Sequence, residues 1–306
     1  MARAKFCLVI DTEADFWRYI PSPHFDRKEL IKWRINKLLP GKFSKGREGI
    51  SKVVNLLKSQ SFPATFTIVG HLYLKKCRGF PHFSEKPEGK WLRTLLGKSW
   101  DYWDSSSNYV ERPEFYLGDF IEKEMGEEFF DLGLHAFSHE ALTLESKESV
   151  NGIISSAVKA AKSLGIKPVS FGSPFNMIED VQNPEKVYSA LKKNGIKIVR
   201  FGGVEDGLRQ KHEVAIRKPF KKYGLKAIHV SHYFEGNSSK DLVRKILKEM
   251  SETARSKRGA VYCLNTHDFT HRNTSNLRTI TNYALRLQKE CKIEIVNMRQ
   301  LIQNDK

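Results

Sequence analysis

Short, strand-like runs of apolar residues alternate with amphipathic, helix-like segments along most of this sequence. The expected strands are 5–11, 63–70, 131–137, 168–175, 196–202, 226–234, 259–269 and 293–297. The expected helices are 49–60, 118–130, 150–165, 183–195, 240–257 and 276–290. Such alternation is typical of parallel βαβ units. Seven to eight strands favour an α/β barrel over a small open sheet, although the pattern alone leaves closure of the barrel open.

One region interrupts this rhythm, from about residue 71 to residue 113. It contains Trp91, Trp100, Trp103 and many polar residues. We interpret it as a long inserted loop over one end of the barrel, where functional loops collect. No linker or internal repeat is evident, so the sequence predicts one domain over residues 1–306.

The composition is that of a folded, basic protein. Hydrophobic residues make up 40% of the 306 residues, which excludes a disordered chain, and the formal net charge is +17. Such a surface would attract nucleic acid, an acidic glycan, a phosphorylated intermediate or a membrane face, or it would serve solubility alone. The densest basic stretches, 26–47 and 242–258, have helical spacing, and no nucleic-acid-binding motif accompanies them.

The cysteines and the chain start indicate a reducing compartment. None of the four cysteines lies in a CxxC pair, so neither a zinc finger nor a disulfide framework is indicated. Cys7 and Cys263 lie in strand-like runs and are expected to be buried as small hydrophobes. The apolar run near the start is too short for a signal peptide, and no run has transmembrane length. We therefore expect a cytoplasmic protein.

Three acids follow the first expected strand within a few residues. They are Asp11, Glu13 and Asp15, and side chains at this spacing share one face while the chain stays extended. Three clustered carboxylates repel one another unless a cation or a proton is present. A polar exit from a strand is the simpler interpretation, but carboxyl ends of barrel strands are also where active sites form.

Histidines follow two other expected strands. His135 and His139 are four residues apart, a spacing that places both rings on one face of a helical turn. Two imidazoles and a carboxylate form a typical catalytic zinc shell. His267 ends a third apolar run, where it could act as an acid–base group. Each motif alone could be an ordinary surface feature, but together at one barrel end they indicate a metal-dependent active site.

The order of these motifs resembles that of the polysaccharide deacetylases, the NodB-type carbohydrate esterase family. The resemblance runs from Lys5 to about Ile302, outside the 71–113 region. The matching stretches are LVIDTEADF, PATFTIVG, LGLHAFSHEAL, VSFGSPFN and YCLNTHDF, of which the third is the most specific. The resemblance implies an α/β fold, a distorted and often incomplete (β/α) barrel of about seven parallel strands.

The resemblance also implies roles for individual residues. Asp11 would be the general base and His267 the general acid. A divalent metal ion, expected to be zinc, would be held by Glu13, His135 and His139. Pro174 and Phe175 would contact the substrate, with the Phe175 N–H helping to hold the oxyanion. The implied reaction removes an acetyl group from an N-acetylated sugar or glycan intermediate, and an acidic substrate would suit the net charge.

Some positions depart from the family pattern. In the commonest form of the first motif the metal-binding acid follows the base directly, whereas here Thr12 follows Asp11. Some branches of the family place this acid two residues after the base, so Glu13 is preferred and Asp15 is the alternative. Gly172 occupies the place of an arginine that usually holds the base; Arg200 could replace that arginine or form an ordinary ion pair. The Asp–Trp motif that usually orients the catalytic histidine is not evident. An amidase with a non-sugar substrate, or an inactive relative that binds glycan or nucleic acid, therefore remains an alternative.

Overall fold

The computed structural model describes residues 3–39, 43–79, 82, 87–104, 106–126, 128–180, 182–202, 216–256 and 258–303. Its strands are β1 (Ala4–Thr12), β2 (Ala64–Ile68), β3 (Lys76–Cys77), β4 (Ser107–Asn108), β5 (Phe130–Leu134), β6 (Ser170–Gly172), β7 (Ile198–Phe201), β8 (Phe220–Lys222), β9 (Leu225–His229), β10 (His232–Tyr233), β11 (Val261–His267) and β12 (Ile293–Ile295). Its helices are α1 (Arg27–Leu38), α2 (Glu48–Ser59), α3 (Lys90–Leu96), α4 (Gly118–Glu124), α5 (Lys147–Lys162), α6 (Lys186–Lys193), α7 (Lys240–Ser256), α8 (Ser275–Lys289) and α9 (Met298–Gln303).

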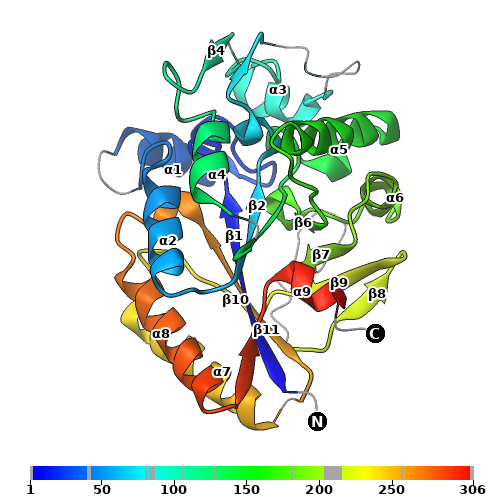
Figure 1. Ribbon diagram of the computed structural model, residues 1–306. Coiled ribbons are helices and arrows are strands. Elements are labelled where there is room, and N and C mark those ends of the chain that lie inside the picture. Colours follow the sequence, from blue (N-terminus) through cyan, green and yellow to red (C-terminus); the bar gives the residue numbers. More distant parts are fainter. Residues whose placement is uncertain are drawn as a thin grey trace.

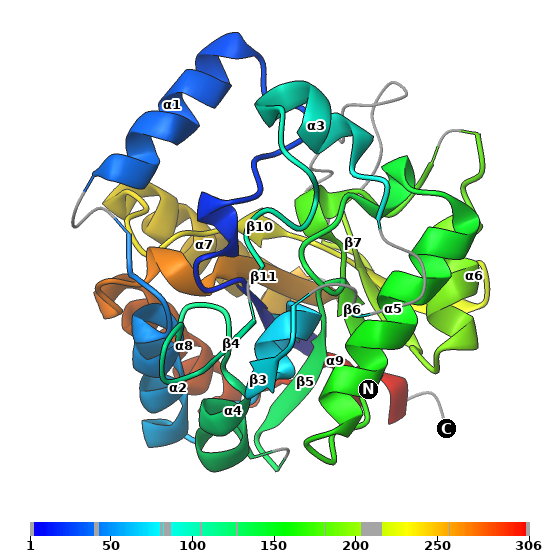
Figure 2. The same cartoon turned by 90° about the horizontal axis from the view of Figure 1, so that it is seen from above.

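A ten-stranded sheet forms the centre of the molecule (Figure 1). Its strand order is β10-β11-β1-β2-β5-β6-β7-β9-β8, and β12 pairs with β1. These strand pairs are parallel except for β8 and β9, which are antiparallel. Helices surround the curled sheet in the view along the strands (Figure 2). The predicted α/β fold, a distorted and mostly parallel barrel, is confirmed.

The expected strand 226–234 is two strands, and this correction explains how the sheet curls. β9 pairs with β7 and β10 pairs with β11, so the two lie toward opposite ends of the strand order. The residues between them contact both ends. The Val230 N–H donates to Phe201 O at 3.2 Å, and the Ser231 N–H donates to Cys263 O at 2.7 Å. The chain therefore joins the two sides of the sheet where the sequence predicted one continuous strand.

The two faces of β1 enter different parts of the core. Side chains alternate across a strand, so Cys7, Val9 and Asp11 share one face. Cys7 and Val9 pack in an inner apolar cluster with residues of β7, β9, β11 and α9, whereas Phe6 and Leu8 pack in the larger core. Cys7 and Cys263 are fully buried, as expected, and they are partners in the register of β1 and β11. Asp11 thus continues an inward-facing row at its carboxyl end.

The helices that cover the sheet have the apolar spacing expected of them. In α5 the buried face includes Val150, Ile153, Ile154 and Ala157, at helical spacing. Ser146 caps this helix by accepting the Ser149 N–H at 3.1 Å. No helix within the described ranges is both long enough and apolar enough to cross a membrane.

The 71–113 region is more ordered than the long loop that the sequence suggested. It contains a 3₁₀ turn (Gly70–Tyr73), the antiparallel pair β3–β4 and helix α3, although residues 80–81, 83–86 and 105 lie outside the described residues. Trp100 and Trp103 are buried in the core. Figure 1 shows α3 and β4 beyond the end of the sheet to which β1 runs. The region, hereafter the insertion, therefore lies over the carboxyl ends of the central strands.

Candidate active site

The carboxyl ends of β1, β5 and β11 bring five of the predicted site residues together. Asp11, Glu13, His135, His139 and His267 all line one pocket with a volume of about 350 Å³. Asp11 and His267 are direct partners in the register of β1 and β11. Parallel strands end at the same edge of a sheet, which is why residues so distant in sequence meet here.

Glu13, His135 and His139 form a compact set of metal-ligand atoms. One ligand atom from each lies within 4.8 Å of those of the other two. Glu13 Oε1 lies 3.2 Å from His139 Nε2 and 3.7 Å from His135 Nε2. Burial alone would raise the pKa of Glu13, but the neighbouring imidazoles, His139 first among them, lower this pKa well below its usual value. The set therefore offers an ionised carboxylate oxygen and two imidazole nitrogens.

The two histidines meet through a tight turn and not through the helical turn that their spacing suggested. Ala136 and His139 have positive φ, of 58° and 63°, which no right-handed helix contains. The buried Glu140 carboxylate holds the turn by accepting the N–H groups of Phe137 at 3.0 Å and Ser138 at 2.8 Å. The ring centroids of His135 and His139 lie 5.0 Å apart. The prediction of a shared face was right in outcome but wrong in backbone geometry.

The tautomer of His135 is set by the sheet. Its Nδ1 lies 2.8 Å from Gly172 O, so the Nδ1–H donates to this carbonyl and the Nε2 lone pair faces Glu13. His139 packs its ring against Phe175 with centroids 4.5 Å apart. The His139 Nδ1 atom is buried and makes no hydrogen bond among the described residues.

Glu13 and Asp15 point to different places. Asp15 accepts hydrogen bonds from Arg18 Nε at 3.1 Å and the Gly46 N–H at 3.2 Å, and it does not line the pocket. The segment that carries Glu13 is fixed by Asp268, whose carboxylate accepts the N–H groups of Glu13 at 2.9 Å and Ala14 at 3.1 Å. The geometry therefore favours Glu13 as the acid beside the histidines.

Asp11 is held by three side chains, from β2, β7 and β11. Arg200 Nη2 donates to both carboxylate oxygens, at 3.0 and 2.8 Å. Asn265 Nδ2 donates at 3.1 Å, and Thr67 Oγ1 donates at 2.5 Å. Burial alone would raise the pKa of Asp11, but the charges of Arg200 and His267 and the Thr67 hydrogen bond lower it. Asp11 is therefore an ionised carboxylate of fixed orientation.

Gly172 explains how Arg200 reaches Asp11. Gly172 and Arg200 are register partners on β6 and β7. A Cβ atom at position 172 would lie 3.0 Å from Arg200 Nη2 and 3.1 Å from Thr67 Cγ2. The absence of a side chain thus leaves room for the guanidinium to pass over β6. The expected arginine contact is present, but it comes from the adjacent strand.

His267 is oriented by an acid that the sequence motifs did not reveal. Its Nδ1 lies 2.7 Å from Glu235 Oε1, while Nε2 faces the pocket, 3.8 Å from Asp11 Oδ2 and 3.6 Å from Glu13 Oε1. Burial alone would lower the pKa of His267, but the Glu235 carboxylate, with Glu13 and Asp11, raises it to about 10. His267 is therefore protonated at neutral pH in this arrangement.

Pro174 and Phe175 lie in a short 3₁₀ turn after β6, where the sequence predicted continued strand. Phe175 and Asn176 both have positive φ, of 54° and 57°, a conformation rarely adopted by non-glycine residues. The turn carries Phe175 into the pocket wall and against the Trp91 ring of the insertion, with centroids 5.9 Å apart. Asn176 Oδ1 accepts from Arg200 Nη1 at 2.9 Å. This turn therefore connects the pocket wall to the residues that hold Asp11.

Aromatic side chains form much of the remaining pocket wall. They are Trp17, Phe25, Trp33 and Phe269, together with Phe175. The Trp33 indole N–H donates to Trp17 O at 2.7 Å, which fixes helix α1 at the pocket rim. Flat apolar faces beside a small polar centre are typical of sites for small organic ligands.

The residues at this centre fit a divalent metal ion. Two imidazole nitrogens and one carboxylate oxygen are the usual protein ligands of catalytic zinc, which keeps a further position open. The fixed tautomer of His135, whose Nδ1–H donates to Gly172 O while Nε2 faces Glu13, agrees with such a role. The spacing of the motifs and the family resemblance led to the same expectation from sequence, and the identity of the metal remains a prediction.

Several residues that shape the site were missed by sequence analysis. Thr67 is the register partner of Asp11, and Asn265 precedes His267 by two residues on the same strand face. Both could have been found from the strand periodicity. Glu235 and Asp268 carry no such signal, because their positions depend on the paths of loops after β10 and β11.

Comparison with known proteins supports the fold. No protein-family model matches this sequence, and no curated protein sequence matches it. A crystal structure of a protein described as a polysaccharide deacetylase, from Mycobacterium smegmatis, is similar, with a TM-score of 0.57 and 13% identity over 99% of this chain and 90% of that chain. The 4-alpha-glucanotransferase from Thermococcus litoralis has a TM-score of 0.53 and 12% identity, over 99% of this chain and 40% of that chain. The resemblance noted in the sequence motifs is therefore matched by structure, and this chain has the fold of the polysaccharide deacetylase-like barrels.

Proposed function

We propose that this protein is a metal-dependent hydrolase that removes an acetyl group from an N-acetylated sugar. The single observation that carries the proposal is the meeting of Asp11, Glu13, His135, His139 and His267 in one pocket at the carboxyl ends of three strands. The arrangement holds what amide hydrolysis needs: a base, a metal-ligand set and a protonated acid.

The chain's own side chains account for the proton transfers. Asp11, ionised and held by Arg200, takes a proton from the attacking water as the water oxygen bonds to the acyl carbon. His267 donates its Nε2 proton to the sugar nitrogen as the C–N bond breaks, and Glu235 stabilises the charged imidazole before this step. Acetate and a free amine are the products. A zinc ion held by Glu13, His135 and His139 would polarise the carbonyl and make the water more acidic.

The pocket wall supports a carbohydrate substrate. Phe175 lies beside the metal-ligand set, where its N–H and the preceding Pro174 are the proposed contacts for the acetyl group. Trp17, Trp33 and Phe269 offer flat faces against which the C–H groups of a sugar ring can pack.

None of the four cysteines forms a disulfide, which agrees with a substrate met in the cytoplasm.

The proposal is tested by product analysis on zinc-loaded protein. Short N-acetylglucosamine oligomers should release acetate and expose amines in equal amounts. A panel of simple N-acetyl amines without a sugar ring separates this activity from a general amidase. Equal turnover of the panel would move the substrate class to non-sugar amides, and no turnover of any amide, with salt-dependent binding of glycan or nucleic acid, would favour an inactive binding protein.

Separate substitution of Glu13 and Asp15 tests which of the two acids is the metal ligand. Glu13→Gln should weaken zinc binding at least about tenfold, or roughly 1.4 kcal/mol, because a neutral amide replaces an ionised ligand. Asp15→Asn is the matched control and should leave the affinity unchanged, since Asp15 contacts Arg18 and the Gly46 N–H instead. Zinc titration against a competing chelator measures both. Loss of zinc in the Asp15 variant alone would reassign the ligand.

Removal of the Glu235 charge tests the role of His267. With Glu235→Gln the pKa of His267 should fall, because Glu235 contributes most among the three acids, with Glu13 and Asp11, that raise it to about 10. Only protonated His267 can act as the acid, so the alkaline limb of the pH profile should move to lower pH in this variant. The rate at neutral pH should fall about tenfold relative to the parent protein. The profile of kcat against pH measures this shift. Glu290→Gln, an exposed acid paired with Lys292, is the control; an unmoved alkaline limb in Glu235→Gln would argue against this role for Glu235.

A further inference from the structure

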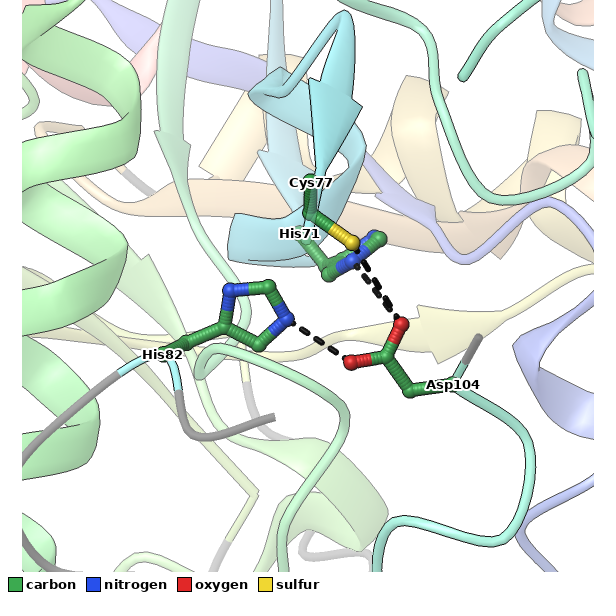
Figure 3. A group of neighbouring side chains, drawn as sticks. All are labelled: His71, Cys77, His82 and Asp104. Atoms are coloured by element: carbon green, nitrogen blue, oxygen red, sulfur yellow. Dashed lines mark hydrogen bonds and ion pairs between the residues drawn. The ribbon is translucent and has the colours of Figure 1, made fainter. Parts of the chain in front are cut away.

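A second group of metal-ligand side chains lies in the insertion, and none of its members lines the pocket. The group, hereafter the insertion cluster, consists of His71, Cys77, His82 and Asp104. One ligand atom from each lies within 4.8 Å of the others. Figure 3 shows the four side chains converging from different parts of the insertion, with Asp104 facing the other three. The chain therefore gathers a thiol, two imidazoles and a carboxylate at one point.

Asp104 lies at the centre of the insertion cluster. Its Oδ2 is 2.8 Å from His82 Nε2. The Cys77 thiol is 3.5 Å from Oδ1, and His71 Nε2 is 3.8 Å from the same oxygen. The side chain of Asp104 is only 1% exposed, so its charge is removed from water. A carboxylate buried in this way needs a positive partner, which without a metal ion is His82: burial alone would lower the pKa of His82, but the hydrogen bonds and charges of Asp104 and Cys77 raise it to about 9.

His71 turns its free nitrogen toward this centre. Its Nδ1 lies 2.9 Å from Phe115 O, so the Nδ1–H donates to that carbonyl and the lone pair is on Nε2. The residue is 0% exposed, and Nε2 has no hydrogen-bond partner among the described residues. The hydrogen bonds within the cluster thus leave one buried acceptor unsatisfied. A cation at the centre would satisfy it together with Asp104.

Aromatic rings cover part of the insertion cluster. The His71 ring centroid lies 4.9 Å from that of Tyr116 and 5.1 Å from that of Trp103. The His82 centroid lies 5.0 Å from that of Phe137. Surroundings of low polarity strengthen the attraction between a cation and its ligands.

The four ligand atoms of the insertion cluster suit zinc in a structural role. One sulfur, two imidazole nitrogens and one carboxylate oxygen suit zinc, and four protein ligands complete a tetrahedral shell, as in structural sites. Bond lengths in such a shell place ligand atoms roughly 3.3 to 3.7 Å apart, and the two contacts to Asp104 Oδ1, at 3.5 and 3.8 Å, are close to this range. We infer that the insertion cluster is a structural zinc site.

The position of this site gives it a function in the fold. The cluster joins the turn after β2, strand β3 and the segment that leads to β4. The same segment contacts the turn that carries His135 and His139, because Trp100 Nε1 donates to Ser138 Oγ in that turn at 2.9 Å. Zinc at the cluster would therefore hold the insertion against the turn that carries the two histidines. The inference rests on the insertion alone and does not depend on the proposed function.

Cobalt and zinc loading test the inference. The purified chain should bind about two zinc ions, one at each ligand set. Cobalt in their place should give a thiolate-to-cobalt charge-transfer band in the near ultraviolet, because only the insertion cluster contains sulfur. Cys77→Ser should lose this band and about one ion. Cys291→Ser, at an exposed cysteine, is the matched control and should retain both.

His135→Ala separates this site from the proposed active site. It should lose about one ion and keep the thiolate band. One ion per chain with no thiolate band in the parent protein would overturn the inference, whatever the outcome at the pocket. A parent protein with the band but without amide turnover would instead overturn the proposed function and leave the structural site intact.

Alkylation of the parent protein gives a test that does not depend on the folding of any variant. Zinc should protect Cys77 from iodoacetamide at least about tenfold relative to chelator-treated protein, because a ligating thiolate is shielded. Cys291 should react equally in both samples. Peptide mapping distinguishes the two cysteines, and equal labelling of Cys77 with and without zinc would overturn the inference.

Discussion

Asp11→Asn should lower kcat at least about 1,000-fold while zinc remains bound. The loss corresponds to roughly 4 kcal/mol of barrier, within the usual range for removal of a general base. Asparagine is nearly isosteric and can still accept the hydrogen bonds from Arg200 and Thr67, so the pocket should keep its shape. Acetate release and metal content, measured on the same preparation, test both parts of this expectation.

A second buried carboxylate provides the control for this experiment. Asp131 is fully buried at the amino-terminal part of β5, where Arg299 Nε donates to it at 3.3 Å. Asp131→Asn should cost stability but leave kcat and its pH profile unchanged, because it lies at the other end of the sheet. Chelated parent protein should resemble Asp11→Asn in rate but not in zinc content. A full rate for Asp11→Asn would exclude Asp11 as the base, and loss of zinc from the same variant would identify Asp11 as a metal ligand.

The sequence predicted those parts of the site that depend on strand ends. Asp11 and His267 follow apolar runs directly, and parallel strands must end at one edge, so their meeting follows from periodicity and handedness. The same reasoning placed Glu13, His135 and His139 near them. Strand limits were less certain, because the strand-like stretch continues without a Gly or Pro through Val230 and Ser231, where the chain leaves one side of the sheet for the other.

The remaining parts depend on loops and on space between side chains, which periodicity does not encode. Glu235 reaches His267 through a loop after β10, and Glu140 folds its turn through backbone hydrogen bonds. The insertion cluster was missed for a related reason: its ligands span His71 to Asp104 without a CxxC pair. A search for paired cysteines finds only sites whose ligands are close in sequence.

We expect a second large loss of activity when the contact between Arg200 and Asp11 is removed. Arg200→Leu would leave the buried Asp11 carboxylate without its cationic partner, and kcat should fall about 100-fold, as when a supporting residue of a catalytic group is lost. Arg200 also lowers the pKa of Asp11. The base works only when ionised, so the acid limb of the pH profile should move to higher pH in this variant. Arg299→Leu, which removes the partner of Asp131, should cost stability without moving that limb.

Rescue across the sheet separates this positioning role from a general loss of stability. Position 172 lies beside position 200 in register, and a Cβ there would lie 3.0 Å from Arg200 Nη2. Gly172→Arg alone should therefore destabilise the protein and give no gain in rate. In the Arg200→Leu background the guanidinium is absent, so Gly172→Arg can supply a cation to Asp11 from the neighbouring strand, although Thr67 must shift by a few tenths of an ångström. The double variant should regain at least about tenfold in kcat and return the acid limb toward its original pH. Steady-state rates across pH for the parent, the two single variants and the double variant test this expectation. A double variant that is folded by circular dichroism but as slow as Arg200→Leu would show that Asp11 needs more from Arg200 than its charge.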